Sequence, residues 1–396
     1  MEPRGLIYFD YAATSFPKPR SVIEETVRCM TEYGGNAGRG THALARAAAE
    51  KIYECRTIAA KHFGVSDPAR VIFTLNTTYA LNTVLKGLLQ KGDRVLLSDI
   101  EHNAVLRPLA QMEREGRITC ELFPSMVCDA RRNAVRICAG IAKRLTKETR
   151  MVVTSHASNL CSVTMPIREI GAFCHRHGLL FVVDGAQSAG HERIHVEEME
   201  IDALCVPSHK GLYGPQGGGM ILLGKGVSPE MLGTLVEGGN GMASLSAEMS
   251  PVFPERYEAG TLPTPVIAGL CEGIRVVEKI GIDEITAHEK TLYCRMRELL
   301  GNIKGVTMYV PQYEGAVLLF NLDGINSERV GRLLAERGIC VRSGYHCAAL
   351  GHKTLDTPEG GAVRASFGIY NHLGEVERFC RAVRDVLKEN NAGAIT

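Results

Sequence analysis

The sequence lacks the features that mark membrane proteins and nucleic-acid-binding proteins. No apolar run approaches the ~18 residues that a membrane-spanning helix needs, and residues 1–4 do not open a signal-peptide pattern. The 45 lysines and arginines almost balance the 44 aspartates and glutamates, so no basic surface for nucleic acid or anionic lipid is expected. We therefore expect a cytoplasmic protein with no membrane and no nucleic-acid partner.

Signatures of metal sites and dinucleotide sites are also missing. The 13 cysteines include no C-x-x-C pair, which argues against a zinc site or a disulfide framework and favours a reducing cytoplasm. No metal is therefore expected. The glycines at 217–219 do not complete a G-x-G-x-x-G pattern, and they precede an apolar run instead of a helix. The chain also has no internal repeat or low-complexity segment.

What the sequence does have is a regular alternation of apolar runs and amphipathic segments. From residue 71 to 223 this alternation predicts a doubly wound, mostly parallel α/β sheet. Strands are expected at 71–75, 94–98, 118–123, 151–155, 179–183, 201–206 and 220–223, and helices at 43–62, 79–89, 104–115, 130–145 and 167–177. Another helix is expected to start at Ser21, which can cap it.

The pattern changes after an irregular segment at 237–265, which is rich in glycine, serine and proline. Helices at 266–280, 282–300 and 327–337 and strands at 306–310, 316–321 and 339–342 predict a smaller α+β domain. The length of 396 residues and the 45% hydrophobic content allow one large and one small domain. We place the large domain at 16–262 and the small domain at 1–15 and 263–396, with the loop 343–353 in the small domain.

Two polar residues follow neighbouring apolar runs. Asp184 ends one predicted strand, and Lys210 lies in the Gly-rich turn after another. Because ligands bind beyond the carboxyl ends of the strands in open α/β sheets, both residues are expected to face one crevice. A lysine and a carboxylate so placed suit pyridoxal phosphate (PLP), which needs a Schiff-base amine and an acidic partner for its ring nitrogen. A surface lysine and a turn aspartate are the alternative from these two residues alone.

Other polar residues also follow predicted strands. They are Glu101, His102 and Asn103, then His156 with Asn159, and Gln187. Asn76, Thr77 and Thr78 open a predicted helix, where backbone N–H groups and hydroxyls can seat a phosphate, although ordinary helix capping explains them equally. Asn36, Arg39 and His42 lie in or just after a Gly-rich loop, which is either solvated or part of a site.

Cys347 differs from most other cysteines of the chain. Cys29, Cys205 and Cys340 lie in apolar periodic settings and are expected to be small core residues. Cys347 instead lies beside His346 in a loop with several glycines, where a thiol can be ionised and reached. We expect His346, Arg342 and His352 to favour the thiolate, and Gly344 and Gly351 to give the loop freedom to move.

Taken in order, these residues form a set of motifs that resembles a known family. The motifs are FDYAATSFPKP, NTT, EHNAVLRPL, SHASN, VDGAQS, SHKGLYGPQG, YEAGT, RSGYHCA and VRASFGIYN. The chain resembles, over nearly its whole length, the PLP-dependent cysteine desulfurases of fold type I in the class V aminotransferase superfamily. The short loop between Cys347 and Arg364 is similar to the group II, SufS-like branch.

The resemblance implies a role for each residue of the predicted site. Lys210 would hold PLP as a Schiff base and move the Cα proton, and Asp184 would pair with the pyridine nitrogen. His102 would stack on the ring, and Arg364 would bind the substrate carboxylate with its planar fork. Further cofactor contacts are implied for Asn159, Gln187, Thr77, Thr78, Ser208, His209 and, from the partner subunit of a homodimer, Thr261. Asn36, Arg39 and His42 would line the substrate mouth.

By this resemblance the expected reaction converts L-cysteine to L-alanine and leaves a persulfide on Cys347 for a sulfur-acceptor protein. A selenocysteine lyase acting on L-selenocysteine is the nearest alternative. Another class V aminotransferase, an epimerase or a cysteine-sulfinate lyase would not use Cys347. A non-catalytic, PLP-binding sulfur-relay protein is the alternative outside the enzymes.

Three departures from the family pattern carry their own expectations. Pro207 stands where the family usually has a hydroxyl residue, so Ser208 is expected to supply that hydroxyl. An additional glycine, Gly211, follows Lys210. Cys161 and Ser162 replace a glycine-bearing turn, which is expected to put a second thiol near the cofactor.

Overall fold

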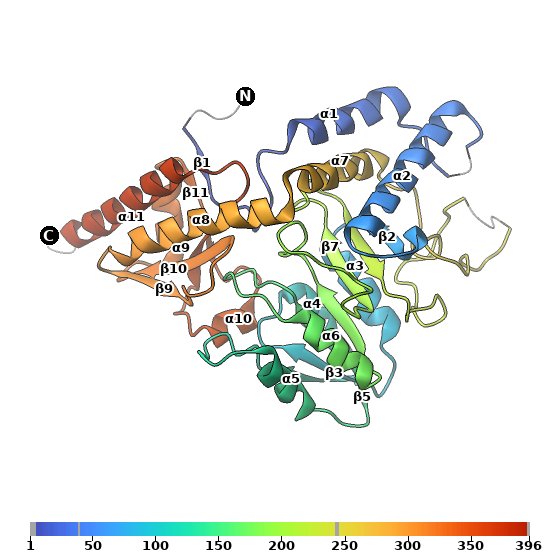
Figure 1. The fold of residues 1–396 in the computed structure, drawn as a ribbon, viewed down its shortest axis with the longest axis horizontal. Coiled ribbons are helices and arrows are strands. Elements are labelled where there is room, and N and C mark those ends of the chain that lie inside the picture. Colours follow the sequence, from blue (N-terminus) through green and yellow to red (C-terminus); the bar gives the residue numbers. More distant parts are fainter. Residues whose placement is uncertain (1–4, 39, 242–244, 394–396) are drawn as a thin grey trace.

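The computed structural model describes residues 5–38, 40–241 and 245–393, and a seven-stranded sheet lies at the centre of the larger part of these residues (Figure 1). The strand order is β2-β8-β7-β6-β5-β3-β4. The bounds are β2 (Val71–Thr74), β3 (Arg94–Ser98), β4 (Thr119–Phe123), β5 (Thr149–Ser155), β6 (Leu180–Asp184), β7 (Ala203–Pro207) and β8 (Gly219–Leu223). Strands β3 to β7 pair in parallel, which confirms the predicted fold class.

Strand β8 differs from a fully doubly wound pattern. It pairs antiparallel with both β7 and β2. The connection from β7 to β8 contains the Lys210 turn and no helix, so the chain reverses direction instead of crossing over. As a result, the segment 208–218 stays at the carboxyl end of β7.

Helices cover both faces of this sheet, so its strands are buried on both sides. They are α2 (Ala43–His62), α3 (Thr77–Leu88), α4 (Asn103–Arg114), α5 (Ala134–Ala142), α6 (Ile167–Arg176) and α7 (Thr264–Ile280). Val153 and Val182 face the core that α3 and α4 complete, whereas their neighbours Val152 and Val183 face the core of α5 and α6. This two-residue alternation is the burial expected of a parallel sheet between two helix layers. Helix α5 begins four residues later than expected because Asn133 caps it.

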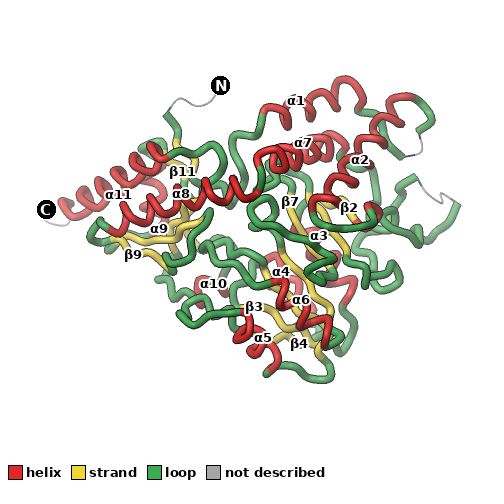
Figure 2. Tube along the Cα trace, in the orientation of Figure 1, coloured by secondary structure: helices red, strands yellow, loops and turns green. Residues whose placement is uncertain are grey.

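The smaller part of the molecule, at the left in Figure 1, contains a four-stranded antiparallel sheet (Figure 2). Its order is β12-β13-β10-β9. The elements are β9 (Val306–Tyr309), β10 (Val317–Leu322), β12 (Arg342–Gly344), β13 (Ala362–Ser366), α8 (Ile282–Gly301), α9 (Ser327–Ala335) and α11 (Leu373–Gly393). The arm strand β1 (Ile7–Tyr8) pairs in parallel with β11 (Ile339–Cys340) and so lies beside this sheet. Domain boundaries at residues 16 and 263 stay a prediction.

The loop 343–353, expected to be irregular, contains a short helix. Helix α10 (Ala349–Thr354) begins two residues after Cys347. None of the helices in the described ranges is long and apolar enough to cross a membrane.

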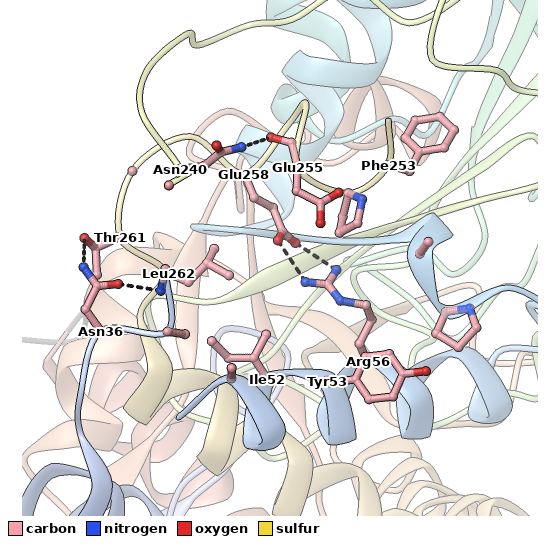
Figure 3. Close-up of a pocket in the computed structure, with 18 of the residues that line it drawn as sticks. Asn36, Ile52, Tyr53, Arg56, Asn240, Phe253, Glu255, Glu258, Thr261 and Leu262 are labelled. Carbon is pink, nitrogen blue, oxygen red and sulfur yellow. Dashed lines mark hydrogen bonds and ion pairs between the residues drawn. The ribbon is translucent and has the colours of Figure 1, made fainter. Parts of the chain in front are cut away.

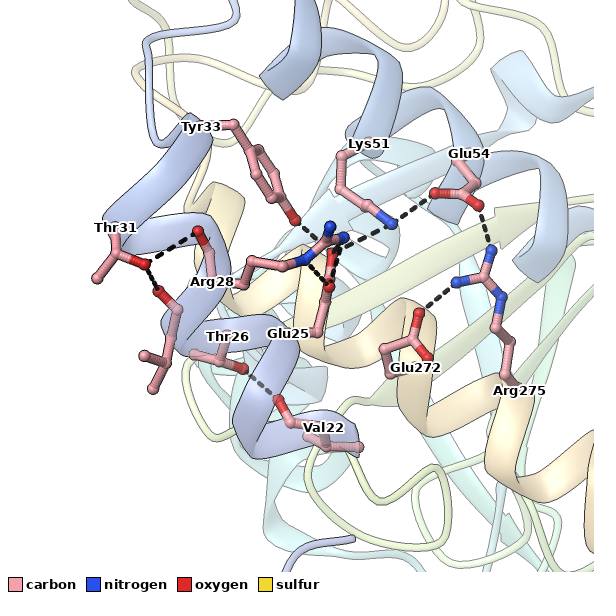
Figure 4. A network of polar contacts seen from close by, with 11 residues as sticks. Val22, Glu25, Thr26, Arg28, Thr31, Tyr33, Lys51, Glu54, Glu272 and Arg275 are labelled. Atoms are coloured by element: carbon pink, nitrogen blue, oxygen red, sulfur yellow. Dashed lines mark hydrogen bonds and ion pairs between the residues drawn. The ribbon is translucent and has the colours of Figure 1, made fainter. Parts of the chain in front are cut away.

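An ion network joins the N-terminal helices to α7 (Figure 4). Glu25, on α1 (Arg20–Arg28), accepts hydrogen bonds from Arg28 and Tyr33 and pairs with Lys51 of α2 at 3.2 Å. Burial opposes ionisation of Glu25, but these hydrogen bonds outweigh it and lower the pKa of its carboxyl group. The network continues through Glu54 to Arg275 and Glu272 of α7. It fixes the helices that flank the loop containing Asn36 and the segment that follows Thr261.

Candidate active site

Polar residues from five strand ends line one cavity at the carboxyl edge of the parallel strands. Asp184 ends β6, and Lys210 follows β7, the next strand in the sheet. The other predicted residues that line this cavity are Thr77, Thr78, His102, Asn159, Gln187 and His209. Asp184 and Lys210 therefore share a single crevice, which excludes the alternative of a surface lysine.

Burial shifts the pKa values of the two central residues. It lowers the pKa of Lys210 to about 8; Asp184 opposes this shift, and Arg364 adds to it. Burial also raises the pKa of Asp184, while the Ala186 N–H, 2.9 Å from Oδ1, and the Lys210 amine counteract that rise. A lysine with this pKa has a large neutral fraction near pH 8 and can act as a nucleophile or a base.

This pKa predicts the pH dependence with which Lys210 would react with an aldehyde such as PLP. Only the neutral amine attacks an aldehyde, so the rate should rise about tenfold per pH unit below 8 and level off above it. A lysine of ordinary pKa would continue to gain rate up to about pH 10.4. The measurement is the rate of borohydride-reducible adduct formation from pH 6 to 10.5. A rate that still climbs above pH 9.5 would contradict the lowered pKa.

His102 caps helix α4 with its imidazole ring. Its Nδ1 accepts the Ala104 N–H at 3.0 Å, which leaves the proton of a neutral ring on Nε2. Burial, with the charges of Lys210 and Arg364, lowers the pKa of His102 to about 4. The ring is therefore neutral at physiological pH, and it lines the cavity as a flat aromatic surface.

The N-terminus of helix α3 offers a seat for an anion. Asn76 caps the helix by accepting the Tyr79 N–H at 2.9 Å. The buried Thr77 Oγ1 and the buried His209 Nδ1 have no hydrogen-bond partner among the described residues. Buried polar atoms in proteins are nearly always paired, so these two unpaired atoms, on residues that line one cavity, fit a phosphate group seated at the N-terminus of α3.

Ser208 does not lie where a hydroxyl that binds the phosphate was expected. It is fully buried, is not among the residues that line the cavity, and its hydroxyl donates to the carbonyl of Pro215. That proton is therefore engaged within the turn. A role for Ser208 in binding phosphate stays a prediction that this placement does not favour.

Arg364 and the N-terminal arm meet beside the cavity. The Arg364 guanidinium is 2% exposed and donates to the Asn159 carbonyl at 2.9 Å and to Asp10 Oδ1 at 3.0 Å. Its Nε has no partner in the described part of the chain. Arg364 thus keeps a free donor for a further anionic group. No pattern in the sequence indicated this role for Asp10, although Asp10 lies in the FDYAAT motif.

Glu101 is a second residue that the sequence reasoning did not assign. It is fully buried next to His102 and accepts hydrogen bonds from the Ser155 N–H at 2.8 Å and the Ser155 hydroxyl at 2.9 Å. Burial raises the pKa of Glu101 to about 8. Because Ser155 ends β5 and itself lines the cavity, Glu101 fixes the exits of β3 and β5 relative to each other.

The exposed thiol of Cys347 lies on a loop that is bonded to residues of the cavity. His346 and Cys347 both have left-handed backbones, with φ of 51° and 55°. The His346 carbonyl accepts the Asn159 side-chain amide at 2.8 Å, and the Cys347 carbonyl accepts the Asn103 N–H at 2.8 Å. The loop is therefore held at the exits of β3 and β5.

Three expectations about this region are corrected. Burial lowers the pKa of His346 to about 3 and that of His352 to about 4, so neither ring supplies a positive charge to Cys347 at neutral pH. Cys161 is buried and does not line the cavity, and burial raises the pKa of its thiol to about 11. Gly351 serves close packing instead of loop freedom, because a Cβ there would approach Leu160 Cδ1 to 2.8 Å.

Gly211 has a packing explanation. A Cβ at this position would lie 2.3 Å from the Ala189 carbonyl and 2.5 Å from the His191 ring. His191 is itself paired with the buried Glu289 at 2.9 Å. The glycine after Lys210 therefore lets the Lys210 turn pack directly on this buried pair.

Asn36 and Thr261 lie at a different cavity, of about 650 Å³ (Figure 3). The Asn36 amide donates to the Thr261 hydroxyl at 3.4 Å, and the buried Arg56–Glu258 ion pair lines the same cavity. His42 caps helix α2 through the Ala45 N–H. Among the described residues these three predicted site residues are not in the Lys210 cavity of the same chain, and Arg39 lies outside the described residues.

The sequence matches the family described as aminotransferase class-V over residues 7–379. The chain belongs to the class V aminotransferase family. The probable cysteine desulfurase of Methanothermobacter thermautotrophicus is 32% identical over 388 residues, which cover 97% of this chain and 95% of that protein. The probable cysteine desulfurase of Pyrococcus abyssi is 33% identical over 390 residues, covering 97% and 94%.

Solved structures of cysteine desulfurases have the same fold as this chain. The apo cysteine desulfurase of Thermococcus onnurineus NA1 superposes with a TM-score of 0.87 at 31% identity, covering 97% of this chain and 95% of that one. The cysteine desulfurase CsdA of Escherichia coli gives a TM-score of 0.83 at 25% identity over the same shares. The predicted family resemblance and the fold type I architecture are confirmed. In the part of the chain that the structure describes, no group of His, Cys, Asp and Glu side chains is arranged to hold a metal ion.

Proposed function

We propose that this class V family member is a PLP-dependent cysteine desulfurase that converts L-cysteine to L-alanine and leaves a persulfide on Cys347. One observation carries the proposal: a half-buried lysine and a buried aspartate share a cavity whose walls are bonded to the loop of an exposed cysteine. The names of the relatives support the same reaction. A cytoplasmic location and a sulfur-acceptor protein stay predictions.

The residues of the cavity fit PLP. When bound, PLP supplies an electron sink for charge that develops at the substrate Cα. Lys210 would hold it covalently, Asp184 would face its ring nitrogen, and His102 would pack on its ring. Its phosphate would take the unpaired donors at the start of α3 and on His209. Asn159 and Gln187 lie on the cavity wall, each with its amide already donating, to the His346 carbonyl and the Ala12 carbonyl.

Two residues of the chain would carry out the steps on the substrate. The neutral Lys210 amine would accept the Cα proton and return a proton to the product. The Cys347 thiolate would attack the sulfur of L-cysteine: the Sγ–S bond forms, and the Cβ–S bond breaks with its electron pair left on carbon. Arg364 would bind the substrate carboxylate through its free Nε–H.

A panel of three substrates tests this function. We expect alanine from L-cysteine, together with one additional sulfur atom on Cys347 by mass spectrometry. The enzyme is incubated in parallel with L-selenocysteine and L-cysteine sulfinate, and alanine is measured for each. Turnover of L-selenocysteine without turnover of L-cysteine would identify a selenocysteine lyase, and turnover of the sulfinate alone would remove Cys347 from the mechanism.

We also propose a homodimer with composite sites. Thr261 lies outside the Lys210 cavity of its own chain, and Thr77 Oγ1 in that cavity has no partner within the described residues. A second copy related by two-fold symmetry would bring Thr261 to the phosphate seat. Light scattering should show a dimer.

Complementation tests whether Thr261 acts across the dimer. Lys210→Ala and Thr261→Val proteins, each impaired alone, are mixed after mild unfolding and reassociated. In a mixed dimer one site combines Lys210 of the second variant with Thr261 of the first, so it should recover native PLP affinity. No recovery in verified mixed dimers would show that Thr261 acts within its own chain or not at all.

A further inference from the structure

Three side chains in and next to the Cys347 loop form a continuous hydrogen-bonded chain. His346 Nε2 lies 3.2 Å from the Arg342 carbonyl, and His346 Nδ1 lies 3.1 Å from His352 Nε2. His352 Nδ1 lies 2.8 Å from the Thr357 hydroxyl. The two imidazole rings are nearly parallel, at 10°. We call His346, His352 and Thr357 the histidine relay.

With both rings neutral, the hydrogen bonds permit one arrangement of protons along the relay. The Arg342 carbonyl can only accept, so His346 must carry its proton on Nε2. His346 Nδ1 is then an acceptor, which requires the proton of His352 to be on Nε2. His352 Nδ1 therefore accepts from the Thr357 hydroxyl. With both histidines neutral, this arrangement satisfies every ring nitrogen of the relay.

The surroundings favour this neutral state. His346 and His352 are 7% and 3% exposed. Their burial, and the positive charge of Arg364, lower the pKa of both rings. The charge of Arg342 also lowers the pKa of His346, whereas the hydrogen bond to the Arg342 carbonyl opposes the shift. The Tyr345 ring packs edge-on against His352.

The relay closes the loop that contains Cys347. His346 directly precedes Cys347, His352 lies on α10, and Thr357 lies beyond the end of that helix. Two backbone hydrogen bonds join the same segment: the His352 N–H donates to the Ala348 carbonyl, and the Thr357 N–H donates to the His352 carbonyl. The left-handed backbone is unfavourable for residues other than glycine, so the pair at 346–347 needs such support to persist.

We propose that the histidine relay positions Cys347 for attack on the substrate sulfur, with His352 and Thr357 as positioning residues that act through His346. This inference rests on the proposed desulfurase function. No relay residue lines the Lys210 cavity, and the bond from Asn159 goes to the His346 backbone carbonyl, so loss of the side-chain relay should leave PLP binding intact.

The test compares Thr357→Val, which removes the terminal donor at nearly constant shape, with Thr357→Ser, which restores it. His352→Phe keeps a ring against His346 and Tyr345 but removes both relay bonds. Lys353→Ala, exposed on the same helix, is the matched control. For Thr357→Val and His352→Phe we expect kcat for L-cysteine to fall about tenfold, the cost of one lost buried hydrogen bond. KM and the PLP absorbance should not change, and Thr357→Ser should recover at least about half of the wild-type kcat by restoring that bond.

A second measurement does not depend on desulfurase activity. The rate of Cys347 alkylation by iodoacetamide in the PLP-bound protein should rise at least about threefold in Thr357→Val and His352→Phe, because a lost hydrogen bond frees the loop. It should stay at the wild-type value in Thr357→Ser and Lys353→Ala. If the wild type releases no alanine from L-cysteine, the proposed function fails, and the alkylation rates still decide the relay. An unchanged alkylation rate in folded Thr357→Val, or a rate in Thr357→Ser that does not return to the wild-type value, would overturn the relay. If His352→Phe does not fold, the two Thr357 variants decide the test alone.

Discussion

Replacing Lys210 by alanine is expected to abolish the covalent attachment of PLP and to lower alanine formation at least about a thousandfold. Lys210 is the lysine among the described residues that line the cavity, and burial lowers the pKa of its amine to about 8. In the proposed mechanism the variant loses the group that attacks the cofactor and the group that moves the Cα proton, and a positioned base alone contributes roughly 10²- to 10⁴-fold. Borohydride reduction followed by peptide mass spectrometry measures the attachment.

Lys18 provides a matched control for Lys210. Burial lowers the pKa of Lys18 to about 8 as well, and its Nζ donates to the His209 carbonyl at 2.9 Å, but it does not line the cavity. Lys18→Met should keep the reducible adduct on Lys210. A reducible adduct at the same site in Lys210→Ala, or its loss in folded Lys18→Met with Lys210 intact, would remove Lys210 from the proposed role.

The polar residues at strand ends could be predicted from the sequence because their signal is local. Asp184 and Lys210 each follow an apolar run directly, and strands of a parallel sheet bring such residues to one edge. The structure places both in one cavity with His102 and Asn159. The fold class follows from the same alternation of apolar runs and amphipathic segments.

Contacts between residues that are distant in the sequence could not be predicted from local patterns. Arg364 meets Asp10 across 354 positions, and no local pattern marks Asp10 as its partner. The antiparallel pairing of β8 with β7 and β2 is also a tertiary property. Thr261 lies beside Asn36 and away from Lys210, a placement that no local pattern in the sequence indicates.

The charge of the residues around Cys347 depends on burial, which the loop sequence does not show. A histidine beside a cysteine in a Gly-rich loop suggests an exposed, protonated ring. In the structure His346 is buried beside Arg364, both of its nitrogens are engaged, and its pKa is lowered to about 3. The short helix α10 has six residues and no side-chain cap, so it gave no signal either.

The second large effect is expected at Cys347. Cys347→Ser should lower alanine formation from L-cysteine at least about a hundredfold, since a positioned reacting group contributes roughly 10²-fold or more. It should also abolish persulfide formation. A serine hydroxyl is close in size but does not ionise near neutral pH and cannot accept the substrate sulfur as a persulfide. The PLP spectrum should not change, because Cys347 does not line the Lys210 cavity.

Variants of two other cysteines show whether the loss of turnover is specific to Cys347 or follows the removal of any thiol. Cys128 is exposed like Cys347, and its thiol lies 3.6 Å from the Thr354 carbonyl at the end of α10, so Cys128→Ser tests a second accessible thiol in the same region. Cys161→Ser tests the buried thiol beside Asn159, whose raised pKa of about 11 keeps it protonated. Both variants should retain wild-type turnover and a persulfide on Cys347. Additional sulfur on Cys161 or Cys128 in the wild type, or wild-type turnover of L-cysteine by Cys347→Ser, would overturn the thiolate mechanism. Turnover of L-selenocysteine that survives in Cys347→Ser would agree with it, because selenium leaves the Cβ atom more readily than sulfur and depends less on attack by a protein thiolate.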